Sequence, residues 1–285
     1  MRLTRSETVA DFVREAGPFL MRHEDEHNLM LGLCATLARQ PEVYPDGAYL
    51  ATITAGDAVI TAALRTPPHQ LVLAGVADGA DAAAAHALLA ADVRALYGAL
   101  SGASGRAEVV RSFAGAWHAL TGEPYHQMLD EYFYRLDRVI PPPPVTGALR
   151  RATEADRPLL ERWLVAFHAE VFDEPDTDQS RWVTNALTFV TRGVYLWEDG
   201  EVVALAGWQG PTEHGVRIGP VYTPPEQRRR GYAGACVGAL SQLLLDEGRD
   251  FCVLYTDVSN ATSNHVYQML GYQRIMEAGV YAFGA

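Results

Sequence analysis

Four consecutive prolines, Pro141 to Pro144, interrupt the chain near its middle, within the stretch RVIPPPPVTG at 138–147. Proline lacks a backbone N–H and has a fixed φ, so such a run is extended and joins neither a helix nor a central strand. At 285 residues the chain is long enough for two domains of ordinary size. We therefore expect a first domain at 1–139, a proline-rich linker at 140–147 and a second domain at 148–285.

Composition narrows the class of protein. Hydrophobic residues make up 48% of the chain and charged residues 20%, which is typical of a folded globular protein. No apolar run approaches the roughly 20 residues that cross a bilayer, and the first residues resemble no secretion signal. Cys34, Cys236 and Cys252 are scattered, which favours reduced thiols. These features predict a cytoplasmic location and no membrane association. A net charge of −12 argues against nucleic acid as a partner.

Hydrophobic periodicity predicts a regular order of elements in the second half of the chain. Thr153 is expected to cap a first helix, and Asp199-Gly200 is a strong turn signal between two strands. The predicted elements are a helix at 154–172, a helix at 179–191, a hairpin around 199–200, a strand at 215–223, a helix ending near 248, a strand at 250–258, a helix at 260–270 and a strand at 278–283.

The first half repeats this order. Residues 48–75 can be laid over 194–219 so that Tyr49 falls on Tyr195, and an alanine-rich helix follows at about 80–100. The match predicts two tandem copies of one α/β (α+β) fold with a mixed sheet. The first copy has AGVADGADAAAA at 74–85 where the second has consecutive arginines, so we expect it to be degenerate, with a structural or acceptor-site role.

The stretch PPEQRRRGYAG at 224–234 holds the densest positive charge of the acidic chain. A helix that begins near Tyr232 presents free N–H groups and the positive end of its dipole to an anion. Gly231 and Ala233 allow the anion close to the backbone, and Arg228, Arg229 and Arg230 add charge. An arginine run before a helix is also typical of a solvated face.

Pro220 lies inside the strand that precedes this turn. Prolines in strands mark edges, bulges or places where two strands part. Parting would leave the backbone groups of Val221, Tyr222 and Thr223 free for a ligand.

A third group follows on the last helix. Ser263 and Tyr267 come three and seven residues after Asn260, a spacing that places all three side chains on one helix face. The alternative interpretation makes Asn260 a helix cap and Tyr267 a core aromatic.

Two of these stretches resemble motifs of one family. RRRGYA at 228–233 resembles the acyl-CoA pyrophosphate motif R/Q-x-x-G-x-G/A of the GCN5-related N-acetyltransferase (GNAT) superfamily. NATSNHVYQMLGY at 260–272 is similar to that family's N-x-x-S/A-x-x-x-Y-x-x-x-G-F/Y segment. The resemblance covers 148–285, and the first half resembles the degenerate copy of tandem members.

The resemblance implies acetyl-CoA as co-substrate and an intact acyl-CoA site in the second copy. Residues 228–233 would hold the CoA pyrophosphate, and residues 221–223 would pair with the pantetheine arm and polarise the thioester carbonyl. Asn260 would bond the pantetheine with Ser263 beside it, and Tyr267 would protonate the leaving thiolate. An amine would attack directly through a tetrahedral intermediate.

The general base and the acceptor stay open. His168, Glu170, Asp173 and Glu174 lie where this family covers the acceptor, and each is a candidate base or acceptor contact or an ordinary solvated residue. Negative net charge favours a cationic amine on a small molecule or peptide. We expect a monomer or homodimer. The alternative function is a non-catalytic acyl-CoA sensor or scaffold.

RHEDEHN at 22–28 contains the H-E-x-x-H pattern of zinc proteases, with His23, Glu24 and His27 as the matching residues. Both intervening residues are acidic, and no third ligand helix follows. The segment is therefore predicted to be an ordinary polar helix start, with no metal.

Overall fold

A computed structural model describes residues 1–76, 79–172 and 193–284. These residues form two compact units. Unit 1 comprises Met1–Phe133, Thr256–Ser259 and Arg274–Ala285, and unit 2 comprises Tyr134–Tyr255 and Asn260–Gln273. The helix expected at 179–191 lies outside the described residues.

Unit 1 is built on a mixed sheet with the strand order β1-β2-β3-β4-β5-β12-β6. Thr8 caps the first helix, and its hydroxyl accepts a hydrogen bond from the Asp11 backbone N–H at 3.1 Å. The elements are β1 (Arg2–Arg5), α1 (Val9–Leu20), η1 (Met21–His23), α2 (Asn28–Arg39), η2 (Pro41–Val43), β2 (Tyr49–Ala55), β3 (Ala58–Arg65), β4 (Leu71–Gly75), α3 (Ala80–Tyr97), β5 (Gly102–Arg106), α4 (Ala107–Thr121), β6 (Tyr125–Leu136) and β12 (Gln273–Phe283).

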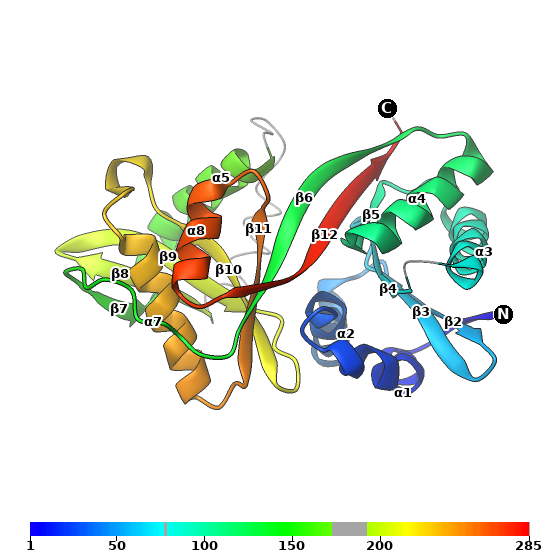
Figure 1. Cartoon of the computed structure of the whole chain (residues 1–285), viewed down its shortest axis with the longest axis horizontal. Helices are drawn as coiled ribbons and strands as arrows, with labels where there is room; N and C mark the ends of the chain where they lie inside the picture. The colour runs from blue at the N-terminus through cyan, green and yellow to red at the C-terminus, as the bar shows by residue number, and fades with distance from the viewer. Residues whose placement is uncertain (77–78, 173–192, 285) are drawn as a thin grey trace. The chain divides into compact units, whose positions relative to one another are not determined.

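Alternation along the strands creates two cores in unit 1. Tyr49, Ala51 and Ile53 of β2 pack with α3 and α4, whereas Leu50 packs with α1 and α2. Successive side chains of a strand point to opposite faces, so each face needs its own layer of helices. Figure 1 shows α1 and α2 on one side of this sheet and α3 and α4 on the other.

Unit 2 has the strand order β6-β11-β10-β9-β8-β7, with the end of β6 contributing to it. Leu160 and Leu164 of α5 pack on one face, and α7 contacts β8, β9 and β10. The further elements are β7 (Ala148–Arg151), η3 (Glu154–Asp156), α5 (Arg157–Phe172), β8 (Val194–Asp199), β9 (Glu201–Gln209), β10 (Gly215–Tyr222), η4 (Pro225–Gln227), α7 (Tyr232–Asp246), β11 (Phe251–Asp257) and α8 (Ala261–Met269).

The predicted repeat is confirmed by the order of elements. Hairpin β2–β3 corresponds to β8–β9, β4 to β10, α3 to α7, β5 to β11 and α4 to α8. The units do not follow the chain as two continuous stretches, however. Strand β12, which ends the second copy, pairs antiparallel with β5 from Gly102↔Ala282 to Arg106↔Ala278, so it belongs to unit 1. A functional division at 140–147 stays a prediction.

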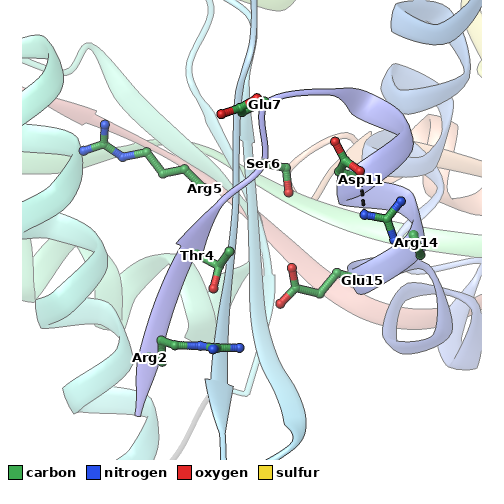
Figure 2. A pocket seen from close by; sticks show the side chains of 8 residues that line it. All are labelled: Arg2, Thr4, Arg5, Ser6, Glu7, Asp11, Arg14 and Glu15. Carbon is green, nitrogen blue, oxygen red and sulfur yellow. Dashed lines mark hydrogen bonds and ion pairs between the residues drawn. The ribbon is translucent and has the colours of Figure 1, made fainter.

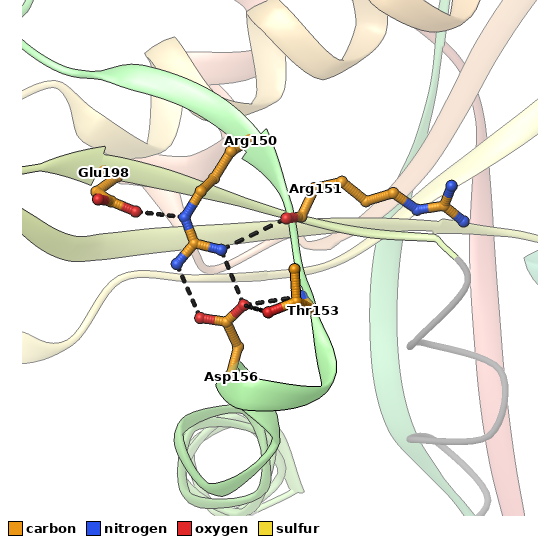
Figure 3. Close-up of polar contacts among 5 residues, drawn as sticks. All are labelled: Arg150, Arg151, Thr153, Asp156 and Glu198. Atoms are coloured by element: carbon orange, nitrogen blue, oxygen red, sulfur yellow. Dashed lines mark hydrogen bonds and ion pairs between the residues drawn. The ribbon is translucent and has the colours of Figure 1, made fainter.

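The predicted start of the first helix of unit 2 is confirmed, and the structure adds an ion pair to it. Thr153 and Asp156 form a reciprocal capping box. The Arg150 guanidinium donates to both Asp156 carboxylate oxygens at 2.8 Å, and it also contacts Glu198 (Figure 3). Asp156 is 11% exposed, and these hydrogen bonds, those from Arg150 first, hold its pKa well below the usual range.

The three cysteines are buried free thiols, and burial raises the pKa of each to about 12. Such thiols are poor nucleophiles at neutral pH. Within the described ranges, no helix has the length and apolar character needed to traverse a bilayer.

Candidate functional site

Strands β10 and β11 of unit 2 part where Pro220 predicted a disruption. They pair in parallel from Gly215↔Phe251 to Arg217↔Val253, and the described residues form no further pair between them. β10 continues to Tyr222, and its register with β9 shifts between Ile218 and Val221. This bulge leaves the backbone of 221–223 beside the opening between the two strands.

The arginine-glycine turn follows directly after this opening. Gly231 caps α7 with φ +86°, a left-handed conformation that favours glycine, and an added Cβ would lie 2.9 Å from Val145 Cγ1. Arg229 also has a positive φ of +61°. The first turn of α7 contains no acidic residue, and the three arginines are exposed. The backbone and the charge both suit an anion here.

Arg228 connects three elements. Its Nε donates to the Thr223 carbonyl at 2.9 Å, and its Nη2 lies 2.7 and 2.8 Å from the two Glu170 carboxylate oxygens. The guanidinium carbon is 5.8 Å from the centroid of the Tyr222 ring. Two residues predicted for different roles, Arg228 for the anion and Glu170 for the acceptor side, are thus brought into contact.

The predicted site residue Tyr232, at the start of α7, is held by a hydrogen-bond network whose other members sequence reasoning missed. Tyr232 donates through its hydroxyl to Asp199 Oδ2 at 2.7 Å, and Thr146 donates to the same oxygen at 2.6 Å. Trp197 Nε1 donates to the Thr146 carbonyl at 2.9 Å. The Thr146 hydrogen bond, and then that of Tyr232, lowers the pKa of Asp199. Asp199 had been recognised only as a turn residue, because its partners are distant in sequence.

Asn260 is the N-cap of α8, as the structural alternative proposed. Its side-chain oxygen accepts a hydrogen bond from the Ser263 backbone N–H at 3.0 Å. Its backbone carbonyl accepts one from the Asn264 backbone N–H at 3.0 Å. Asn260 is exposed and Ser263 half-buried, and the cap uses the side-chain oxygen of Asn260 rather than its amide nitrogen.

Tyr267 lies in a cluster of tyrosines. Its side chain is 8% exposed, and its ring centroid is 5.9 Å from that of Tyr272 and 6.5 Å from that of Tyr134. Burial raises its pKa to about 12, so the phenol carries its proton at neutral pH. A protonated phenol is the form that a general acid requires.

Tyr134 was also missed, because it precedes the region of resemblance. Its hydroxyl donates to Asn264 Oδ1 at 3.2 Å and accepts from Gln268 Nε2 at 3.0 Å. These bonds fix α8 against the end of β6 and thereby position the Tyr267 ring.

The candidate base and acceptor residues fall into two groups. His168 and Glu170 lie on the last turns of α5, half-buried and exposed respectively. Asp173 and Glu174 lie outside the described residues.

The H-E-x-x-H segment does not form the single helix that a zinc-protease site needs. η1 ends at His23, a turn follows, and α2 begins only at Asn28. His27 Nδ1 lies 2.9 Å from the Leu20 carbonyl oxygen. No cluster of three potential metal ligands occurs among the residues with described positions.

An open hollow lies between β1 and α1 of unit 1 (Figure 2). Its charges are of both signs, and two of its cations are paired, Arg14 with Asp11 at 2.5 Å and Arg5 with Asp92 at 2.6 Å. This pairing leaves no clear preference for a charged ligand. The lining residues are Arg2, Thr4, Arg5, Ser6, Glu7, Asp11, Arg14 and Glu15.

Comparison with known proteins agrees with the geometry. The FR47-like protein family model matches residues 193–280. A GNAT-family acetyltransferase from Colwellia psychrerythraea has a TM-score of 0.55 at 12% identity, covering 99% of both chains. A GCN5-related N-acetyltransferase from Sphaerobacter thermophilus has a TM-score of 0.57 at 18% identity, covering 98% of this chain and 94% of that one.

A tandem GNAT protein from the clavulanic acid biosynthesis pathway has a TM-score of 0.56 at 12% identity, covering 99% of this chain and 98% of that one. No match was found among curated proteins. The chain therefore has the tandem GNAT fold. Its residues 193–280 match the FR47-like family, and the predicted resemblance to the GNAT superfamily is confirmed.

Proposed function

We propose that this protein is an acetyl-CoA-dependent N-acetyltransferase whose acyl-CoA site lies in the second copy. The observation that carries the proposal is the parting of β10 from β11 directly before the Gly231 turn. The parted strand offers backbone groups to an extended ligand, and the turn offers N–H groups and arginine charge to a pyrophosphate.

In the proposed reaction an amine nitrogen attacks the thioester carbonyl. The C–N bond forms, the nitrogen loses a proton to a general base, the C–S bond breaks, and CoA leaves as a thiolate. A backbone N–H within 221–223 would stabilise the charge on the carbonyl oxygen. Tyr267 would give its proton to the thiolate, and Asn260 would bond the pantetheine through its amide nitrogen.

The proposed acceptor is a primary amine on a small molecule or peptide. The net charge of −12 raises the local concentration of cations and repels CoA at long range, so the arginine turn must overcome that repulsion locally. His168 stays a candidate base, as do Asp173 and Glu174. We further propose a cytoplasmic monomer or homodimer, with no nucleic-acid partner and a first copy that is structural or contributes to the acceptor site.

Tyr267→Phe tests the catalytic assignment, with Tyr272→Phe as the matched control. Tyr272 belongs to the same cluster, but its hydroxyl lies 2.8 Å from Ser241 Oγ. CoA release is measured at saturating acetyl-CoA over a panel of amines. We expect kcat to fall about 100-fold or more in Tyr267→Phe and to change little in Tyr272→Phe.

An unchanged kcat in Tyr267→Phe would reject its role as the acid. Tight CoA binding by calorimetry with no acetyl transfer to any amine would instead favour the sensor or scaffold alternative.

A further inference from the structure

We propose that Glu170 is an internal anion that occupies Arg228 and competes with the phosphates of acyl-CoA for it. This inference rests on the proposed function. It gives Glu170 a role different from that of a general base.

The contact joins α5 to the arginine-glycine turn. Arg228 begins the anion-binding turn, and Glu170 lies on the last turn of α5 that the structure describes. Nη2 of Arg228 lies 2.7 and 2.8 Å from the two Glu170 oxygens, while Nε is held 2.9 Å from the Thr223 carbonyl. The carboxylate therefore takes the N–H groups of Nη2, which a phosphate oxygen would otherwise use.

The other two arginines of the turn differ from Arg228. Among the residues that the structure describes, neither Arg229 nor Arg230 forms an ion pair with a carboxylate, whereas Arg228 pairs with Glu170. A phosphate that arrives at the turn meets two arginines that lack a carboxylate partner among the described residues and one that is paired with Glu170. Binding through all three requires the release of Glu170.

The release of Glu170 from Arg228 affects the binding of the amine, which is the second substrate. The Glu170 carboxylate becomes an unpaired negative charge on α5 when a phosphate takes Arg228. An unpaired carboxylate attracts a cationic amine more strongly than a neutralised one. CoA binding therefore favours the subsequent arrival of the amine.

Calorimetry with CoA tests the competition in Glu170→Gln, with Glu226→Gln as the matched control. Glu226 lies in η4 two residues before Arg228, and the described part of the chain gives it no ion pair. Both variants remove one negative charge near the turn. An exposed pair of this kind has a modest strength, so we expect Glu170→Gln to lower the Kd for CoA about threefold to fivefold at low salt. Glu226→Gln should lower it by less than about twofold.

Two further measurements isolate the pair. In an Arg228→Gln background, Glu170→Gln should leave the Kd for CoA unchanged, because the group for which Glu170 competes is gone. The KM for S-acetyl-pantetheine, which lacks phosphates, should be the same in Glu170→Gln and the parent.

Equal effects of Glu170→Gln and Glu226→Gln would overturn the proposal in favour of general charge repulsion. Weaker CoA binding in Glu170→Gln would overturn it by showing that Glu170 holds Arg228 ready for phosphate. A fall in kcat with no change in Kd would assign Glu170 as the base instead. Failure of the parent protein to bind CoA would overturn the proposed function and this inference together, whereas CoA binding that is unchanged by Glu170→Gln would overturn only the inference.

Discussion

The residues that cap α3 and α7 are both glycines with a positive φ, but their ψ angles differ, 172° at Gly79 and −4° at Gly231, and so does the chemistry around them. Gly79 caps α3 with φ +97°, and Gly231 caps α7 with φ +86°. The first turn of α3 carries Asp81, which opposes an anion, whereas α7 has no acid in its first turn and follows three arginines. The comparison teaches that a repeated fold keeps its glycine while one copy loses the charge that anion binding needs.

The strands before these turns, β4 and β10, differ in how far each extends beyond its pairs with the parallel strand beside it. β4 pairs with β5 from Leu71↔Ala103 to Leu73↔Gly105 and ends at Gly75, so little of it extends beyond the ladder. β10 continues from its last pair at Arg217 as far as Tyr222. Only β10 therefore carries a stretch of backbone long enough to pair with an extended ligand.

The helices α4 and α8 also diverge. The buried aromatics of α4 are Phe113 and Trp117, and Trp117 Nε1 donates to Glu123 Oε2 at 2.8 Å. Setting Gly122 on Gly271 in the sequence places His118 opposite Tyr267. His118 is exposed, with its Nδ1 2.7 Å from the Glu123 carbonyl oxygen. The first copy thus fills this place with a large apolar ring and has no buried phenol there.

The largest expected effect concerns β12, the strand that ends the second copy but pairs with β5 of unit 1. A fragment 1–139 lacks β12, whose Tyr281 and Phe283 belong to the core around α3 and α4. We expect it to unfold without a cooperative transition, because Phe113 and Trp117 lose the ring of Phe283 and β5 loses one of its two neighbouring strands. Denaturant unfolding followed by tryptophan fluorescence measures this.

The matched control is the same fragment with residues 272–285 joined to its end through a flexible linker. Recovery of a cooperative transition in that protein would support the conclusion that the first copy needs β12 to fold. A cooperative transition in 1–139 alone would show that the first copy is complete without β12.

Gly231→Glu and its counterpart Gly79→Glu test whether only the turn before α7 binds CoA. Both replace a glycine at positive φ with an acidic side chain, but an added Cβ meets Val145 at residue 231 and nothing within 4 Å at residue 79. We expect Gly231→Glu to raise the Kd for CoA at least roughly 100-fold, about 2.7 kcal/mol, and Gly79→Glu to leave it unchanged. Circular dichroism confirms that each variant is folded.

CoA binding that survives Gly231→Glu would remove the turn from the site. An equal loss in Gly79→Glu would show that the first copy also binds CoA, and the contrast between the copies would fail.

Local chemistry explains what could be predicted from sequence. The hairpin at Asp199-Gly200, the parting at Pro220 and the turn at Gly231 are each specified by residues close in the chain, and all three occur in the structure. The pairing of β12 with β5 could not be predicted, because hydrophobic periodicity identifies a strand but not its partner.

Side-chain contacts between residues distant in the sequence could not be predicted for the same reason. The bonds of Asp199 to Tyr232 and of Glu170 to Arg228 join residues that only the folded sheet brings together. Asn260 shows a different limit. Its spacing fits both a cap and a ligand contact, and the structure demonstrates the cap while the ligand contact stays a prediction.

The smallest expected effect compares the capping sites that begin the two copies, Thr8–Asp11 and Thr153–Asp156. Asp156 is 11% exposed and receives two hydrogen bonds from Arg150, whereas Asp11 is 40% exposed and pairs with Arg14 on its own helix. We expect Asp156→Asn to lower the free energy of unfolding by about 1–2 kcal/mol at pH 7, and Asp11→Asn to lower it by less.

Low pH should remove the difference in the free energy of unfolding between the parent and Asp156→Asn. The folded state lowers the pKa of Asp156, so the ionised carboxylate stabilises the fold above the usual aspartate pKa of about 3.9, and this contribution declines as the pH falls below that value. Urea unfolding of the parent and Asp156→Asn between pH 3 and pH 7 should therefore give curves that converge toward pH 3. The parent and Asp11→Asn should differ little throughout. A stability difference between the parent and Asp156→Asn that stays constant with pH would mean that the Asp156 carboxylate has no lowered pKa. Equal losses of unfolding free energy in Asp156→Asn and Asp11→Asn would mean that the capping sites of the two copies are energetically equivalent.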